Sequence, residues 1–109
     1  MGLDIRQISE ELGFEIHEYL DVLDVFLDNT PKVISKFRIC LKEDNLIEGA
    51  ELCHLIKGGA SSIGLDVISD VAHQIKIACK TGDTSTIPEL LEKLVSLVAN
   101  LDEQRNSLT

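Results

Sequence analysis

The sequence predicts an all-α domain, built as a bundle of helices. Three observations support this prediction. Apolar residues recur at the i, i+3, i+4 spacing of amphipathic helices along most of the chain. The intervals between these stretches are short and rich in Gly, Pro, Asp, Asn and Thr, which favours antiparallel neighbours. Only four residues are aromatic, whereas Leu and Ile are frequent, as expected where helices pack through aliphatic side chains.

The first two helical stretches are separated by a glycine. A short helix is predicted over residues 5–12, ending at Gly13, because glycine adopts the backbone angles that terminate helices. The next stretch has apolar residues at helical spacing: Phe14, Tyr19, Leu20, Leu23, Phe26 and Leu27. Thr30 before Pro31 is typical of a capped restart. Pro31 therefore marks either a new helix to about Lys42 or a kink in a longer one.

The third helix is predicted over residues 46–62. Asp44 and Asn45 precede it, and short polar side chains of this kind cap helix N-termini. Gly64 follows it and marks its end.

Two more helices complete the predicted bundle. Asp66 is expected to cap the fourth, which runs to about residue 81 and stops at Gly82. Thr86, followed by Pro88, opens the last helix. Its apolar stripe consists of Leu90, Leu91, Leu94, Val95, Leu97, Val98 and Leu101.

Length and composition indicate one domain over residues 1–109, because a chain of 109 residues that is 44% hydrophobic supports a single core. It contains neither a run of about 18 apolar residues nor the pattern of a signal peptide. We therefore expect a cytoplasmic protein. Its three cysteines are widely spaced, which fits neither a disulfide framework nor a metal site. We interpret Cys40, Cys53 and Cys79 as buried thiols in a reducing compartment.

The charge of the chain excludes some partners. With 19 acidic and 10 basic residues, its formal net charge is −9. Nucleic acids and anionic membranes attract positive surfaces, so neither is an expected partner. We also expect a monomer.

The helix over residues 46–62 carries the most informative residues. On a wheel of about 100° per residue, with Leu46 at zero, one arc collects apolar side chains: Leu52, Ile63, Ile56, Ala60 and Cys53. His54 lies at roughly 80°, nearly opposite this arc. The residues that flank it on the wheel are Lys57, Ser61, Ile47 and Gly58. The pattern therefore predicts a histidine that faces solvent.

Gly58 distinguishes this histidine from an ordinary surface residue. A glycine inside a helix costs about 1 kcal/mol relative to alanine, so a small residue is kept there at the expense of helix stability. Gly59 lies at the edge of the buried arc, where close helix packing explains it. Gly58 faces solvent one turn beyond His54, where a missing side chain gives access to the imidazole.

The stretch CHLIKGGASSIG, from Cys53 to Gly64, resembles the phosphoacceptor helix of histidine-containing phosphotransfer domains. The resemblance centres on His54, Lys57, Gly58 and Gly64, and helix order and length extend it over roughly residues 5–101. It implies an antiparallel four-helix bundle with a short extra N-terminal helix. It also implies a phosphorelay function in two-component signal transduction, with a phosphohistidine at position 54.

The resemblance implies the roles of the site residues. His54 would accept a phosphoryl group from a receiver-domain aspartate and pass it to another receiver, while Lys57, one turn away, neutralises a phosphoryl oxygen. The implied partners are response-regulator receiver domains and a hybrid sensor histidine kinase. The chain would need no cofactor or metal of its own, because the partner receiver would hold the Mg²⁺ ion.

One position departs from the family pattern. A Gln or Glu on the neighbouring helix often hydrogen-bonds the imidazole in this family, and the same spacing here leads to Lys76. A charged lysine cannot accept a hydrogen bond. Either Lys76 adds a second cation beside the phosphoryl group, with Lys80 extending the basic patch, or it points to solvent. Ser61 shares the His54 face and is a further candidate for contact at the site.

The surface around His54 is a predicted docking site for the partner. Ile47, Ala50 and Gly58 are expected on the exposed arc, where they leave an apolar patch of low relief. His17 and His73 lie in no motif and are interpreted as ordinary helical residues.

Two alternatives belong to other functional classes. An autokinase would need a glycine-rich ATP site, which this sequence lacks, so the chain is expected to be a phosphotransfer intermediary and not an ATP-dependent enzyme. A non-phosphorylated adaptor that binds receiver domains would leave His54 idle, and Lys57 and Gly58 argue against that indirectly. The sequence leaves open whether the chain is free-standing or part of a hybrid kinase.

Overall fold

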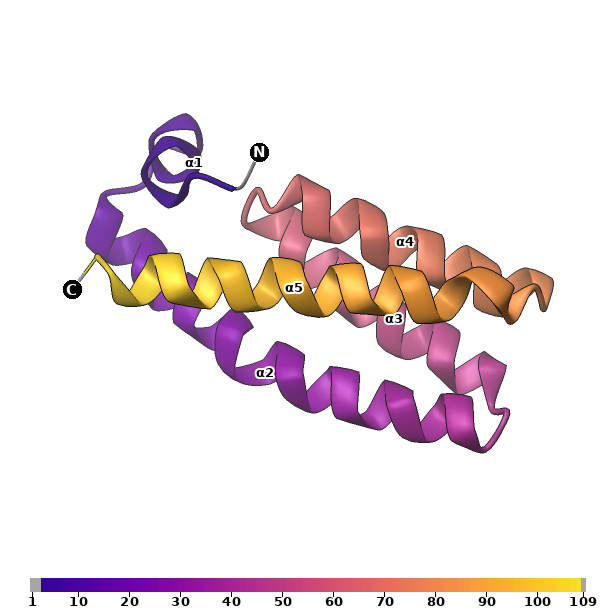
Figure 1. Ribbon diagram of the computed structural model, residues 1–109. Helices are drawn as coiled ribbons and strands as arrows, with labels where there is room; N and C mark the ends of the chain where they lie inside the picture. The colour runs from indigo at the N-terminus through magenta and orange to yellow at the C-terminus, as the bar shows by residue number, and fades with distance from the viewer. Residues whose placement is uncertain (1–2, 109) are drawn as a thin grey trace.

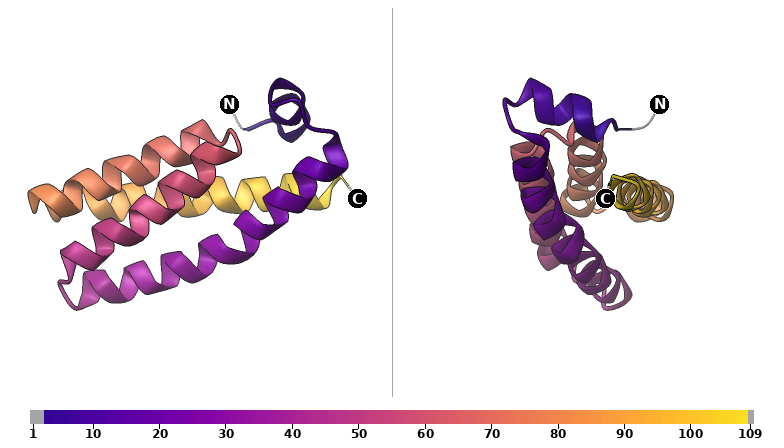
Figure 2. Two further views of the ribbon diagram at one scale, coloured as in Figure 1. Left: turned by 180° about the vertical axis from the view of Figure 1, so that it is seen from behind. Right: turned by 90° about the vertical axis from the view of Figure 1, so that its left-hand side faces the viewer.

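The computed structural model describes residues 3–108, and this part of the chain is helical throughout its regular structure. The elements are α1 (Ile5–Glu11), α2 (Ile16–Lys42), α3 (Leu46–Ser62), α4 (Asp66–Thr81), the 3₁₀ turn η1 (Thr84–Thr86) and α5 (Ile87–Asn106). Helices α2 to α5 lie side by side, and α1 lies at one end of them (Figure 1). Figure 2 shows the same arrangement from two further sides. The predicted four-helix bundle with a short N-terminal helix is confirmed.

The core runs along the whole length of the bundle. The longest dimension of the molecule is 42 Å, which matches the roughly 40 Å expected for the 27 residues of α2. Every long helix contributes fully buried side chains, among them Leu23, Phe37, Cys53, Ile68, Ile75 and Leu94. The most extensive helix–helix contact joins α3 to α4, and α2 covers another side of α3. Helix α3 is thus held between two neighbours.

Helix α2 continues through Pro31, which settles the alternative that the sequence left open. Thr30 is a buried residue within the helix and not the cap of a new one. A proline inside a helix removes one backbone hydrogen bond and costs about 3 kcal/mol. Buried side chains on both sides of the proline, including Leu27 and Ile34, favour one helix. Tertiary packing therefore overrides the local signal.

The ends of α3 and α4 follow capping chemistry. The Asn45 side chain accepts a hydrogen bond from the Glu48 backbone N–H, as predicted for an N-cap. Gly64 and Gly82 follow the C-terminal ends of α3 and α4 with φ of +76° and +78°. The prediction for Asp66 was wrong by one position. Leu65 is the N-cap residue and Asp66 is the first residue of α4, with its carboxylate in the first turn, where the helix dipole favours negative charge.

The last helix begins close to where it was predicted. Pro88 lies in the first turn of α5, where its missing N–H costs nothing. Thr86 makes no side-chain capping bond there. Asp83 instead caps η1, because its carboxylate accepts a hydrogen bond from the Ser85 N–H.

Polar contacts close the end of the bundle where α1 lies. The Ile5 backbone N–H donates to Gln104 Oε1 at 2.6 Å, and Gln104 Nε2 donates to the Leu3 carbonyl. Arg105 donates to both carboxylate oxygens of Asp24, at 2.7 and 3.0 Å. These contacts connect the last turns of α5 to α1 and α2.

The three cysteines are buried free thiols, as predicted. Burial raises the pKa of the Cys53 thiol to about 12. Across residues 3–108, no helix is both long enough and apolar enough to cross a membrane.

Candidate functional site

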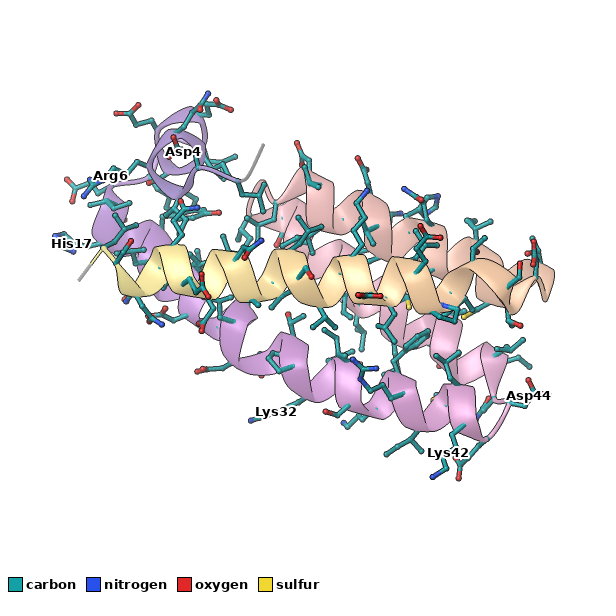
Figure 3. All side chains as sticks on the ribbon, viewed as in Figure 1. Asp4, Arg6, His17, Lys32, Lys42 and Asp44 are labelled. Atoms are coloured by element: carbon teal, nitrogen blue, oxygen red, sulfur yellow. The ribbon has the colours of Figure 1, made fainter. Side chains whose placement is uncertain are left out.

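His54 lies on α3 with an exposed side chain, as the wheel predicted. Within residues 3–108, no side chain or backbone group forms a hydrogen bond with its imidazole. A ring nitrogen is therefore free to react or to meet a partner. The other histidines lie elsewhere. His17 projects from the start of α2, at the end of the molecule near α1 (Figure 3), and His73 lies beside a groove lined by α4 and residues 83–90.

Two hydrogen bonds, one buried and one partly buried, hold the helix that carries His54. The Ser69 hydroxyl of α4 donates to the Lys57 carbonyl of α3 at 3.2 Å. The Tyr19 hydroxyl of α2 donates to the Ile63 carbonyl at 2.6 Å, next to the end of α3. Burial raises the pKa of Tyr19 to about 12. Because α4 bonds to α3 and α2 bonds to the residue that follows it, the exposed face of α3 is presented on a firm support.

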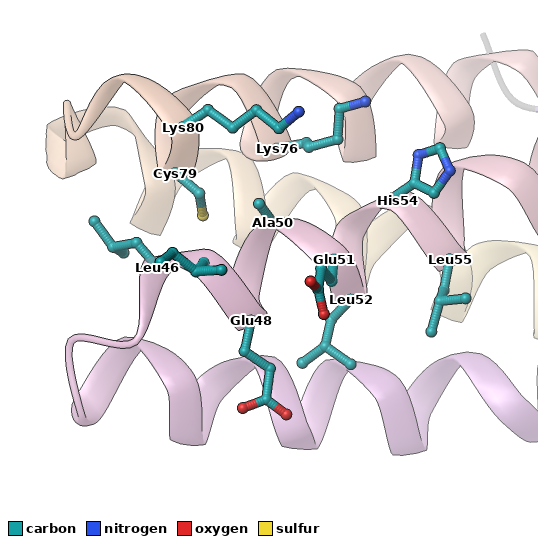
Figure 4. Close-up of a pocket in the computed structure, with 11 residues that line it drawn as sticks. Leu46, Glu48, Ala50, Glu51, Leu52, His54, Leu55, Lys76, Cys79 and Lys80 are labelled. Atoms are coloured by element: carbon teal, nitrogen blue, oxygen red, sulfur yellow. The ribbon is translucent and has the colours of Figure 1, made fainter.

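A groove of about 770 Å³ follows the His54 side of α3 and continues onto α4. From α3 it is lined by Leu46, Ile47, Glu48, Ala50, Glu51, Leu52, His54 and Leu55, and from α4 by Lys76, Cys79 and Lys80. Figure 4 shows Lys76 and Lys80 extending from α4 on the side of α3 from which the His54 ring projects. The structure therefore brings together His54 and Lys76, two residues that the sequence paired only by spacing.

Lys76 is partly buried, and its surroundings disfavour its positive charge. Its pKa is lowered first by partial burial and then by the positive charges of Lys57 and Lys80. Lys57 and Lys76 lie on different helices, so the effect of Lys57 on Lys76 places the two residues in one electrostatic cluster. The site is locally positive on a chain whose formal net charge is −9.

Lys57 and Ser61 follow His54 on α3 at intervals of three and seven residues, which bring side chains to the same helix face. Lys57 is partly buried and Ser61 is exposed. Within the described residues, the Ser61 hydroxyl makes no hydrogen bond, so it remains available to a ligand or partner.

The expected exposure of Ala50 was wrong. Ala50 is only 5% exposed, because α3 packs against α4 as well as α2 and the short alanine side chain lies at that seam. The buried arc of α3 is therefore wider than a single-helix wheel indicates. His54 lies on the α4 side of the exposed face and not opposite the core. Ala50 lines the groove and is not part of the exposed apolar patch.

The exposed apolar surface is made by other residues. Ile47 is 82% exposed, as predicted, and Leu55 on the same helix is 62% exposed. Leu55 also lines a second groove, of about 650 Å³ between α2 and α3, together with the exposed Val25. Leu55 and Val25 were not predicted from the sequence, although apolar residues at solvent-facing wheel positions are the signal that identifies such a patch.

The glycines of α3 differ in what surrounds them. A Cβ atom at Gly58 would have no heavy atom within 4 Å, which agrees with its predicted exposure. A Cβ at Gly59 would lie 3.6 Å from the Phe26 ring, an ordinary contact, so only a larger side chain is excluded. The tightest of the three positions is Gly49, where a Cβ would approach the Phe37 ring to 3.2 Å. This role of Gly49 was not predicted from the sequence.

Comparison with known proteins agrees with this architecture. Residues 21–104 match the sequence profile of the family described as Hpt domain. No curated protein and no solved structure matches the chain. The matched region includes α3 and α4 completely, and with them every residue of the site described above.

Proposed function

Because the chain belongs to the Hpt domain family, whose members act in histidine phosphotransfer, we propose that it is a phosphocarrier of a phosphorelay. His54 accepts a phosphoryl group from a receiver-domain aspartate and passes it to a second receiver. The observation that carries this proposal is the exposed imidazole without a hydrogen-bond partner in residues 3–108, next to Lys57 and Gly58. Transfer of label from one phosphorylated receiver to the chain, and onward to another, tests it.

The chemistry needs few protein groups. A neutral imidazole is a nucleophile near pH 7, and phosphoryl transfer through a loose transition state depends on positioning and charge neutralisation. Lys57 supplies a positive charge one turn from His54, and Lys76 supplies one from α4. Ser61 is placed to contact the phosphoryl group or the partner. We place the Mg²⁺ ion of the reaction on the partner receiver.

Hpt domains are phosphocarriers and not autokinases, so the chain depends on a phosphorylated donor. We propose response-regulator receiver domains and a hybrid sensor histidine kinase as its partners. The exposed Ile47 and Leu55 and the open surface over Gly58 support docking of a protein on this face.

Gly58→Ala tests whether this glycine serves access. We expect the variant to unfold with an equal or higher free energy, by up to about 1 kcal/mol, because alanine favours helix and its Cβ meets nothing within 4 Å. Transfer from the receiver should become slower, since the added methyl group stands one turn from His54. Thermal melting and rapid-quench transfer assays measure the two effects.

Gly59→Leu is the matched control, and should lose about 1–3 kcal/mol of unfolding free energy through overpacking against Phe26. A strongly destabilised Gly58→Ala, or one with unchanged transfer, contradicts the assignment.

Ile47→Asp and Lys57→Ala should separate docking from chemistry. Ile47→Asp should weaken receiver binding about tenfold, or 1.4 kcal/mol, and leave the reaction of His54 with phosphoramidate unchanged. Lys57→Ala should slow phosphorylation by both donors roughly 10- to 100-fold, because its charge acts on the phosphoryl group itself. Calorimetry and ³¹P NMR measure the two effects.

Ile77→Asp is the control for the docking variant, since Ile77 is an exposed residue that lines the groove beside His73. The division of roles is wrong if Ile47→Asp binds receiver like the unchanged chain. It is equally wrong if Lys57→Ala slows only the receiver reaction.

A further inference from the structure

Positive charge gathers beside His54 on a chain that is otherwise acidic. The positive charges of Lys57 and Lys80 both act on Lys76, although the chain has 19 acidic and only 10 basic residues. Within residues 3–108, none of the three has a carboxylate at salt-bridge distance. Arg105, by comparison, is paired with Asp24. The cluster of these three lysines therefore carries charge that no neighbouring acid neutralises.

The positive charge of Lys76 is disfavoured in the free protein. Partial burial and the charges of Lys57 and Lys80 lower the pKa of Lys76, which means that its charged form is held at a cost. An anion placed among the three amines removes part of that cost. A negative charge bound beside Lys76 would therefore interact favourably with these lysines.

The lysines that favour a bound negative charge lie on the same side of the groove as the His54 imidazole. In Figure 4 the amine of Lys76 lies between the amine of Lys80 and the His54 ring, along one side of the groove. Glu48 points away from the lysines, toward α2. Glu51 is the other carboxylate that lines the groove. A phosphoryl group on His54 would therefore bring negative charge into the groove that Lys76 and Lys80 also line.

We propose that Lys76 and Lys80 favour the phosphorylated state of His54 and prolong its lifetime, so that the chain retains the phosphoryl group. The inference rests on the proposed function. In the loading step a ring nitrogen forms the N–P bond with its lone pair, while the aspartyl O–P bond breaks and its electron pair returns to the carboxylate. The phosphoryl group brings close to two negative charges to the lysines.

The same charges slow the loss of the group. Hydrolysis passes through a loose, metaphosphate-like transition state, in which the phosphoryl oxygens carry less negative charge than in phosphohistidine. The lysines therefore stabilise phosphohistidine more than the transition state for its hydrolysis. Removing either amine should lower that barrier.

The test uses the full chain and phosphoramidate as the donor. After loading and removal of the donor, ³¹P NMR follows the decay of phosphohistidine in the unchanged chain, in Lys76→Met and in Lys80→Met. We expect half-lives roughly two- to fivefold shorter in both variants. Lys93→Met is the control, because Lys93 is exposed on α5 and lines neither groove beside His54, and it should leave the half-life unchanged. Lys76→Arg should retain most of the lifetime.

A second measurement detects the interaction between Lys76 and the phosphoryl group without relying on hydrolysis. Side-chain NMR titration should show a higher pKa for Lys76 after phosphorylation, because binding linkage is reciprocal. Unchanged half-lives in both variants, or a Lys76 pKa that does not rise, overturn the inference and leave the phosphocarrier proposal intact. If the unchanged chain takes no label, or if His54→Gln is labelled equally, the proposed function itself fails and the inference fails with it.

Discussion

His54→Gln is expected to take up no phosphoryl group from a phosphorylated receiver domain under conditions that label the unchanged chain. Glutamine has an amide in place of the imidazole and offers no nucleophilic nitrogen. The substitution should not disturb folding, because His54 is exposed and makes no hydrogen bond within the described residues. Incorporation of labelled phosphate, with circular dichroism as the check on folding, measures the result.

The other histidines provide the controls for this experiment. His17→Gln and His73→Gln should be labelled like the unchanged chain, because His17 lies at the α1 end of the bundle and His73 beside the groove shared by α4 and residues 83–90. The label should be acid-labile, as a phosphoramidate is. Equal labelling of His54→Gln, or an acid-stable phosphoserine, contradicts the assignment. If the unchanged chain binds receiver domains but takes up no label, the result favours the adaptor alternative.

Gly64→Ala is expected to cost the fold about 2–3 kcal/mol of unfolding free energy. Part of the cost is backbone strain, because φ at this position is +76° and an L-residue pays about 1–2 kcal/mol there. The rest is steric, since the new Cβ would lie 2.8 Å from Ile8 Cγ2 and 3.2 Å from Leu12 Cδ1. The Ile8 side chain, or the backbone on one side of the contact, must therefore shift. Urea unfolding measures the change.

Gly82→Ala separates the two contributions. Gly82 has nearly the same φ, +78°, but a Cβ there would meet no heavy atom within 4 Å. It should lose only the backbone part, about 1–2 kcal/mol. Equal losses in the two variants would show that contact with α1 does not matter at Gly64.

Sequence reasoning predicted most helix ends in this chain because they depend on local chemistry. Asn45 caps α3 through its own side chain, and Gly64 and Gly82 follow helices at a backbone angle that favours glycine. The continuity of α2 through Pro31 was not predictable in this way. It depends on side chains of other helices that bury residues on both sides of the proline.

In the site, too, the features that depend on one helix were predictable, and those that depend on a neighbouring helix were not. The wheel of one helix correctly placed His54, Gly58 and Ile47 in solvent. It could not show that α4 covers Ala50, nor that Lys76 lies in the same groove as His54, because both depend on the neighbouring helix. The hydrogen bond from Ser69 to the Lys57 carbonyl has no sequence signature of its own.

The buried hydrogen bond between Tyr19 and the Ile63 carbonyl also has a practical consequence. Tyr19 is the only tyrosine of a chain that contains no tryptophan, so its phenol dominates the near-ultraviolet absorbance. That ring lies where α2 meets the end of the helix that carries His54. Its optical signal therefore reports the integrity of this junction, and a melting curve recorded by absorbance follows the support of the site without any added label.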